Sequence, residues 1–268
     1  MGALQQDEVS SGKFRSAGQR RARLIELLRT ELFADIQILR ERLGVSIATV
    51  RRDLSELESK GLLKRTHGGA TVINQVTRDN DAIVREAINA AEKAQIGEAA
   101  AELVSDGDAV MIDSGTTSLQ VAKVLAANAN LTFVTNGTDV LKALVEGGAR
   151  NVHFIGGEYV DINHSCGGAM AAEQVRRFNV DKAILSVSSV DVKRRLICTL
   201  SPQIGSVQQA MIEIAQEVIV VADHSKFDRT ALSVIGGLDA LDYIVTDAAT
   251  RPLVGGLPDA LKQKFIFA

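Results

Sequence analysis

Two adjacent arginines, Arg51 and Arg52, lie among small and polar residues that would let a helix approach another molecule closely. Arginine is the usual bidentate partner of a guanine edge in the DNA major groove. Hydroxyl groups just before the arginines can hold a backbone phosphate at a helix N-terminus. The spacing therefore predicts a helix that reads duplex DNA. The residues expected on its outer side are Ser46, Ala48, Thr49, Arg51, Arg52 and Ser55.

A basic hairpin is expected directly after this helix, with strands at 62–65 and 70–73. Three of its residues can contact phosphates or the minor groove, namely Lys64, Arg65 and His67. The alternative is a solvated helix face on which Asp53 and Glu56 pair with the two arginines. Because turn glycine, helix cap, apolar stripe, outward arginines and basic hairpin coincide, the order favours a winged helix-turn-helix.

A second set of polar residues follows the ends of several β-branched runs. The segment Asp113-Ser114-Gly115-Thr116-Thr117 ends the first run and opens a helix, and its glycine lets the backbone approach a ligand. Free N–H groups and hydroxyls at a helix N-terminus favour an anion, so this segment predicts a phosphate cradle. It is not a nucleotide P-loop, because it lacks that motif's glycine spacing and lysine.

Two later run ends carry similar chemistry. One contributes a short polar turn, and the other contributes Lys226 to balance a phosphate and Asp223 to accept a ligand hydroxyl. Each segment alone also fits a plain strand-to-helix connection or a surface ion pair. Their equivalent places at strand ends favour a ligand site, because ligands bind at the carboxyl ends of parallel strands. The turn residues in this set are Thr135, Asn136 and Gly137.

Catalytic and metal chemistry are not favoured. The four histidines lack metal-ligand spacing, and no Ser–His–Asp arrangement is found. Cys166 and Cys198 are far apart in the sequence and are expected to be buried, inert thiols rather than oxidation sensors. We therefore expect no catalytic residue, no metal and no cofactor beyond a bound effector.

The elements that must position the arginines are three short helices. The first is expected from Gln19, and the second from Asp35 to Leu43, where Gly44 supplies a left-handed cap. Ser46 is a suitable N-cap for the third helix. Its buried stripe is predicted from residues recurring at three- and four-residue steps, Val50, Leu54 and Leu57.

The remaining chain alternates helical stretches with short apolar runs. Runs of this kind are typical of a parallel sheet buried on both faces by helices, which predicts an α/β fold. A helix is expected from about Ala91 to Val104. The expected strands are at 109–113, 131–135, 151–156, 181–187, 217–223 and 242–247.

Length and charge divide the chain. A chain of 268 residues is comfortable for two domains. Residues 1–78 contain 14 Lys and Arg against 9 Asp and Glu, whereas residues 79–268 contain 16 against 24. A basic head on an acidic body is expected when only one domain faces phosphates. The predicted parts are a disordered tail at 1–18, a DNA-binding domain at 19–74, a linker at 75–90 and an effector-sensing domain at 91–268.

Composition restricts the location. No apolar run approaches the ~18 residues that a membrane span needs. The N-terminus lacks a secretory signal pattern, and two cysteines fit a reducing compartment. A cytoplasmic protein that does not contact a membrane is therefore expected.

The stretch VSIATVRRDLSELESKGLLKRTHGGA resembles the N-terminal signature of the DeoR family of bacterial transcriptional regulators. Two positions depart from it: Arg40 replaces a small alanine at the helix–helix contact, and Leu32 replaces a turn glycine. The second half resembles the DeoR-type sensor domain, a Rossmann-like α/β domain related in fold to ribose-5-phosphate isomerase and CoA transferases. Its matching pieces include Glu92-Lys93, Asp113–Thr117, Thr135–Gly137 and Ala222–Phe227.

The resemblance implies a repressor of a carbohydrate catabolic operon that a phosphorylated sugar or related metabolite relieves. It implies operator DNA as a partner, a homo-oligomer (dimer or tetramer), and Asp191 as an effector residue. The segment 186–190 departs from the family pattern, and Gln209 replaces a common lysine, so an altered effector or a narrowed pocket is expected.

Two alternatives stay open. One is a sugar-phosphate isomerase or acyl transferase with an appended DNA-binding domain, in which Asp113, Asp191 or Glu173 supplies acid/base chemistry. The other is a DNA-binding protein that responds to no effector.

Overall fold

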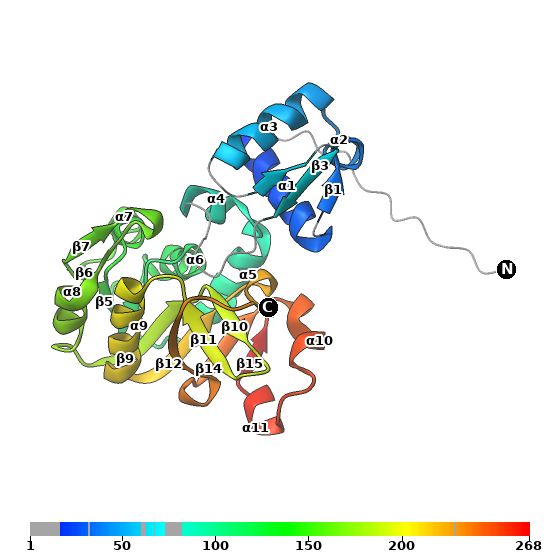
Figure 1. The fold of residues 1–268 in the computed structure, drawn as a ribbon. Helices are drawn as coiled ribbons and strands as arrows, with labels where there is room; N and C mark the ends of the chain where they lie inside the picture. The colour runs from blue at the N-terminus through cyan, green and yellow to red at the C-terminus, as the bar shows by residue number, and fades with distance from the viewer. Residues whose placement is uncertain (1–16, 32, 60–62, 67, 73–81, 228) are drawn as a thin grey trace. The chain divides into compact units, whose positions relative to one another are not determined.

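The computed structural model describes residues 17–31, 33–59, 63–66, 68–72, 82–227 and 229–268. It forms two compact units, Met1–Asn74 and Gln75–Ala268 (Figure 1). Of the predicted tail, residues 1–16 lie outside the described residues, whereas Ala17 and Gly18 begin a helix. Of the predicted linker, residues 75–81 lie outside the described residues, and a helix occupies Ala82–Ala87.

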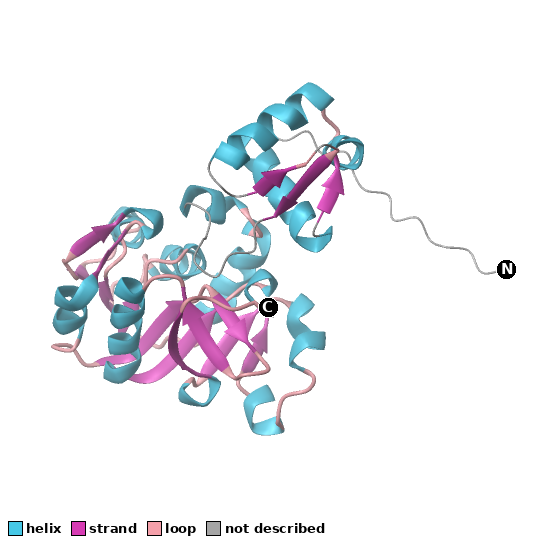
Figure 2. Ribbon diagram, viewed as in Figure 1, coloured by secondary structure: helices cyan, strands magenta, loops and turns pink. Residues whose placement is uncertain are grey.

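The first unit is built from three helices and a small antiparallel sheet (Figure 2). The helices pack their leucines into one core, in which Leu24, Leu28, Leu39 and Leu54 are almost fully buried. The sheet order is β1-β3-β2. The elements are α1 (Ala17–Glu31), β1 (Phe33–Asp35), α2 (Ile36–Leu43), α3 (Ile47–Ser59), β2 (Leu63–Arg65) and β3 (Gly69–Val72).

Local signals set the helix ends as predicted. Gly44 ends α2 in the left-handed conformation, with φ of 63°. The Ser46 hydroxyl accepts a hydrogen bond from the Thr49 N–H at 3.2 Å, which is an N-cap for α3. The sequence did not predict β1. Asp35 ends this strand and caps α2 by accepting from the Gln37 N–H at 2.7 Å.

The second unit contains a seven-stranded parallel sheet of order β15-β14-β12-β9-β4-β5-β6. Its chain order reverses between β4 and β9, so the sheet has a topological switch point there. The six predicted runs all form strands of this sheet, and only β15 was not predicted. The bounds are β4 (Ala109–Ile112), β5 (Thr132–Thr135), β6 (Asn151–Phe154), β9 (Val180–Ser186), β12 (Ala215–Val221), β14 (Tyr243–Thr246) and β15 (Phe265–Phe267).

Helices cover both faces of this sheet, as the apolar runs predicted. One buried cluster joins the sheet to α5, α6 and α7, through residues such as Ile96 and Leu119. The other joins it to α8, α9, α10 and α11, through residues such as Val175 and Met211. The bounds are α4 (Ala82–Ala87), α5 (Ala90–Ala101), α6 (Thr116–Leu125), α7 (Thr138–Glu146), α8 (Gly168–Val175), α9 (Pro202–Ile214), α10 (Arg251–Val254) and α11 (Asp259–Lys262).

Two smaller sheets were not predicted. A hairpin pairs β7 (Glu158–Val160) with β8 (Ser165–Gly167), and a three-stranded sheet has the order β10-β11-β13. The latter strands are β10 (Ser189–Asp191), β11 (Leu196–Thr199) and β13 (Ser233–Gly237). Across the described part of the chain, no helix is long and apolar enough to cross a membrane.

Candidate functional site

Helix α3 presents its predicted faces. The stripe residues Val50, Leu54 and Leu57 are at most 1% exposed. On the other side Arg51 and Arg52 are exposed, and neither guanidinium makes an ion pair or hydrogen bond with a residue that the structure describes. Ala48 and Ser55 are exposed as well, and Thr49 is half-buried with its hydroxyl 2.9 Å from that of Ser46. The surface predicted to read DNA is therefore accessible.

The acidic residues of α3 face away from these arginines. Asp53 is 2% exposed, and both of its carboxylate oxygens face α1, where Arg20 Nε lies 2.5 Å from one and Arg20 Nη2 lies 3.1 Å from the other. Arg21 lies 3.5 Å from Asp53 and also pairs with Glu56. The alternative in which Asp53 and Glu56 neutralise the outward arginines is therefore wrong: their charges are balanced by α1.

The hairpin is tied to the second half of α3. Arg65 donates from Nη1 to the Ser55 hydroxyl at 2.7 Å, and its backbone N–H donates to Glu58 Oε1 at 2.9 Å. Lys64 lies in β2 opposite Thr71, and the structure describes its backbone alone. The predicted contact residue His67 also lies outside the described residues.

The glycines of the hairpin serve close packing. A Cβ atom at Gly69 would lie 2.0 Å from the Ala34 carbonyl oxygen of β1, so only glycine fits there. The Gly68 carbonyl accepts from the Ile36 N–H at 2.9 Å, which joins the hairpin to the start of α2. Arg40, the family departure on α2, is exposed and lies 3.6 Å from Glu41, so it does not disturb the contact between α2 and α3.

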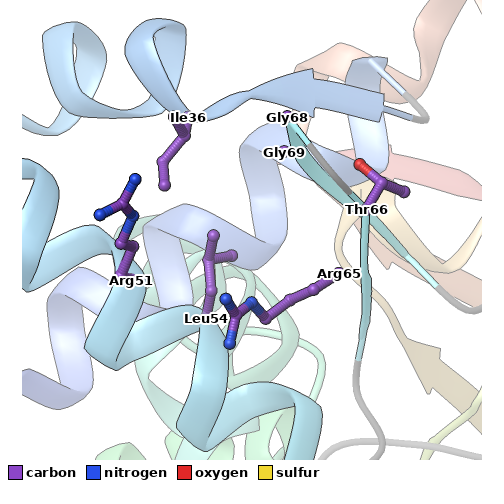
Figure 3. A pocket seen from close by; sticks show the side chains of 7 residues that line it. All are labelled: Ile36, Arg51, Leu54, Arg65, Thr66, Gly68 and Gly69. Atoms are coloured by element: carbon purple, nitrogen blue, oxygen red, sulfur yellow. The ribbon is translucent and has the colours of Figure 1, made fainter.

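A groove of about 360 Å³ runs between the middle of α3, the start of α2 and the hairpin (Figure 3). Arg51 and Arg65 extend their guanidinium groups along it from opposite sides, and Leu54 lies between them. Two cations over a concave surface suit the negatively charged backbone of DNA. The groove residues are Ile36, Arg51, Leu54, Arg65, Thr66, Gly68 and Gly69.

In the second unit, Asp113 joins three elements at the switch point. Its carboxylate accepts from the Ser186 N–H at 2.9 Å, from Gln208 Nε2 at 2.8 Å and from the Gly115 N–H at 3.1 Å. Burial raises the pKa of Asp113, and these hydrogen bonds offset only part of that rise. The predicted effector residue Asp113 thus has its acceptor positions occupied by the protein itself.

The helix starts beside Asp113 fit the predicted anion site better. Gly115 and Gly137 occupy the N-cap positions of α6 and α7, and neither helix has a side-chain cap. The two turns are close, because a Cβ atom at Gly137 would lie 2.7 Å from Ser114 Cα. Ser114 and Thr116 are half-buried, whereas Thr117, Thr135 and Asn136 are buried. The Thr135 hydroxyl accepts from the Gly137 N–H at 3.1 Å and serves its own turn.

Asp223, at the end of β12, is fully buried. One carboxylate oxygen accepts from Asn89 Nδ2 at 2.7 Å and from the Ser225 N–H at 3.0 Å. The other oxygen, Oδ2, is buried without a hydrogen-bond partner among the described residues. Burial alone would raise the pKa of Asp223, but the nearby ammonium groups of Lys226 and Lys93 lower it overall. This carboxylate is therefore an ionised acceptor with one oxygen available.

Two further residues near the candidate site, one on α9 and one after β12, were not singled out from the sequence. Gln208 is buried on α9 between Ile204 and Met211, and the signal was a polar residue within an apolar stripe. His224 Nδ1 lies 3.1 Å from both oxygens of Asp247, which follows β14. The hydrogen bond to Asp247 raises the pKa of His224 despite burial. No local pattern indicates this pair, because it joins two separate strand ends.

Other predicted residues have local roles. Asp191 accepts from the Arg194 N–H at 2.9 Å and so closes the turn between β10 and β11. Cys166 and Cys198 are free and buried, as expected. Among the described residues no group of three or more His, Cys, Asp or Glu side chains is arranged to hold a metal ion.

Comparison with known proteins assigns both units. Residues 20–76 match the model of the DeoR-like helix-turn-helix domain, and residues 88–248 match that of the DeoR C terminal sensor domain. The chain is 48% identical to the transcriptional repressor AccR of Agrobacterium fabrum, over 95% of this chain and 99% of that protein. It is 32% identical to the glycerol-3-phosphate regulon repressor of Escherichia coli, over 86% of this chain and 90% of that protein.

Among solved structures, ribose 5-phosphate isomerase A of Methanocaldococcus jannaschii gives a TM-score of 0.40 at 14% identity, over 52% of this chain and 55% of that chain. This likeness is too distant to carry an argument about function. The family matches and the two repressors decide the matter: the chain belongs to the DeoR family and is a DNA-binding transcriptional repressor, not an enzyme.

Proposed function

We propose that this repressor controls a carbohydrate operon and is relieved by a phosphorylated, hydroxyl-rich metabolite. The metabolite would bind at the carboxyl ends of β4, β5 and β12. Relatives are named for the glycerol-3-phosphate regulon and for a lactose phosphotransferase system, which supports the class of effector.

The observation that carries the proposal is a set of buried acceptor oxygens without partners. Asn136 Oδ1, Gln208 Oε1 and Asp223 Oδ2 are each buried and make no hydrogen bond with a described residue. The amide nitrogens of Asn136 and Gln208 donate to carbonyl or carboxylate oxygens, which fixes the orientation of both amides. A buried acceptor without a donor is costly. Ligand hydroxyl groups would supply the missing donors.

The phosphate group of the metabolite would bind at a different position from its hydroxyl groups. We propose that Ser114, Gly115, Thr116 and Thr117, at the uncapped start of α6, hold the phosphate with Gly137 beside them. Lys226 would supply a cation. Asp191 would contribute at the rim, because its neighbour Val190 bridges to Phe227.

On the DNA side, we propose that Arg52, Ala48 and Ser55 face base edges. Phosphates would be bound by Ser46, Thr49, Arg51, Lys64, Arg65 and His67. A symmetric operator is read by paired heads, so we propose a homo-oligomer that acts on DNA in the cytoplasm.

Titration tests the effector. Fluorescence anisotropy of labelled operator DNA would be measured with glycerol 3-phosphate, glucose 6-phosphate, the matching unphosphorylated compounds and inorganic phosphate. We expect a phosphorylated compound to weaken operator binding and its unphosphorylated form to do so far less. Thr116→Val should remove the response while operator affinity without ligand stays unchanged. Unchanged operator affinity with every compound would refute a phosphorylated effector.

A further inference from the structure

Asn89 uses its side chain in an unusual way. It occupies the N-cap position of α5 with a left-handed backbone, φ of 51°, yet makes no capping bond to its own helix. An asparagine at this position normally accepts from an N–H two or three residues later. Here Nδ2 donates to Asp223 Oδ1 at 2.7 Å, across 134 positions of the sequence. A capping side chain is thus directed at the buried carboxylate of the proposed effector site.

The helix just before Asn89, α4, is held by the loop between β7 and β8. Arg85 of α4 donates from Nη2 to the Ile162 carbonyl at 2.9 Å and to Asn163 Oδ1 at 3.0 Å. That loop is bonded in turn to the start of α7, because the Thr138 N–H donates to the His164 carbonyl at 2.8 Å. Helix α4 is therefore anchored near the β5 turn as well as, through Asn89, at the end of β12.

Lys93 links these anchors. Its ammonium group donates to the carbonyls of Arg85 and of Ile88, the latter at 2.7 Å, at the end of α4. The same buried ammonium contributes to lowering the pKa of Asp223. The end of α4 and the carboxylate at β12 therefore share one cation.

We propose that Asn89 is a positioning residue that couples ligand occupancy at Asp223 to α4, the helix that precedes the sensor domain in the chain. A ligand hydroxyl on Asp223 Oδ2 holds the carboxylate in the orientation in which Oδ1 faces Asn89, so the Asn89 hydrogen bond persists and α4 is ordered. The inference rests on the proposed effector site. It adds the route by which that site acts on the segment leading to the DNA-binding unit.

The clean perturbation is Asn89→Gly. Glycine adopts the left-handed conformation without cost, and no capping bond is lost because none exists. In the full-length chain without ligand, we expect amide hydrogen exchange over residues 82–88 to accelerate by about tenfold. This is the change expected when one hydrogen bond to a charged group is lost. Asn128→Ala is the matched control, since Asn128 donates to Asp106 at the same distance, 2.7 Å, on an exposed surface. It should leave exchange in 82–88 unchanged.

A swapped pair separates coupling from a local backbone role. Asn89→Asp places two carboxylates together and should accelerate exchange in 82–88. Adding Asp223→Asn removes one of the two carboxylates and supplies a donor toward position 89, while the Ser225 N–H loses the acceptor it shares with Asn89, so the double variant should recover part of the protection. If Asn89 acted only on the local backbone, adding the change at position 223 would leave the exchange rates over residues 82–88 as they are in Asn89→Asp.

The response to ligand completes the test. Glycerol 3-phosphate, glucose 6-phosphate and inorganic phosphate serve as probes, and a compound that binds should slow exchange in 82–88 of the wild-type chain. In Asn89→Gly a binding compound should no longer change operator affinity. Unchanged exchange in ligand-free Asn89→Gly, or no recovery in the swapped pair, overturns the coupling whatever the effector is. Failure of all probes to bind overturns the proposed effector class, while the exchange and swap results still decide the coupling.

Discussion

Replacing Asp53 by alanine tests what holds α3, the helix proposed to read DNA, in place. The carboxylate is 2% exposed and is enclosed by Arg20 and Arg21 of α1. Alanine leaves Arg20 without this carboxylate and leaves Arg21 beside it with Glu56 as its remaining acidic partner among the described residues. The exposed arginines of α3 are not touched by the change, so a loss of DNA binding would be an effect on the helix position.

The magnitude follows from the burial of the three partners. Removing one member of a fully buried ion pair costs about 3–5 kcal/mol. The side chains of Arg20 and Arg21 are 18% and 20% exposed, so water reaches them and reduces the cost of leaving their charges without Asp53. We expect Asp53→Ala to cost about 2–3 kcal/mol. A domain of this size is stable by only about 3–8 kcal/mol, so the loss is a large fraction of the total.

The assay is native-state hydrogen exchange of α1 and α3 in the full-length chain, together with operator affinity. Glu56→Ala is the control, because Glu56 pairs with Arg21 but keeps 40% of its side chain exposed. An exposed pair of this kind contributes at most about 1 kcal/mol. If Asp53→Ala costs no more than Glu56→Ala, the buried carboxylate does not hold α3 against α1, and the reasoning is refuted.

Three further predictions concern other sites. Arg52→Ala should cost about 1–3 kcal/mol of operator-binding free energy and relax the preference for particular bases. Arg65→Ala should weaken binding to all DNA sequences alike. If anisotropy titrations of Arg52→Ala show equal losses on every DNA sequence, Arg52 is a phosphate contact and does not read a base. Gly115→Ala should destabilise the sensor domain by about 1–3 kcal/mol in urea unfolding, because the added Cβ atom would lie 1.5 Å from Ser186 Oγ. Adding Ser186→Gly should recover most of the lost stability. If it recovers none, the clash is not with Ser186. Because the pKa of His224 is raised and that of Asp247 is lowered, the extra stability of wild type over His224→Gln should be full between about pH 4 and 6.5. It should decline as pH rises through the raised pKa of His224 or falls through the lowered pKa of Asp247, and a difference in melting temperature that is independent of pH would contradict the pairing.

The first unit could be predicted well because its signals are local. Gly44, Ser46 and the stripe at Val50, Leu54 and Leu57 act over three to four residues, and each behaves as predicted. The partner of Asp53 could not be predicted in this way. Arg20 is 33 residues away, and only the packing of α1 against α3 brings the two together.

The candidate effector site shows the same limit more strongly. The sequence correctly placed polar turns after β4, β5 and β12, because apolar runs identify the strands and their ends. It could not assign the hydrogen-bond partners within the turns. Asp113 was predicted to face a ligand, but Ser186 and Gln208 donate to it across 73 and 95 residues. Asn89 could not be found at all, since it lies in a segment with no apolar stripe.

The charge of the chain explains why the proposed effector site would need such specific elements. Residues 79–268 contain 16 basic and 24 acidic residues, so the sensor domain as a whole repels an anionic metabolite. Attraction must come from short range, where Lys93, Lys226 and the uncapped start of α6 act within the screening distance of about 8 Å at physiological salt. The same negative charge keeps this domain away from DNA phosphates, whereas the basic residues 1–78 favour them. In the function proposed above, an effector that neutralises the local cations does not reduce the positive charge of the head, so the proposed relief of repression would have to proceed through conformation, which is the role proposed for Asn89 and α4.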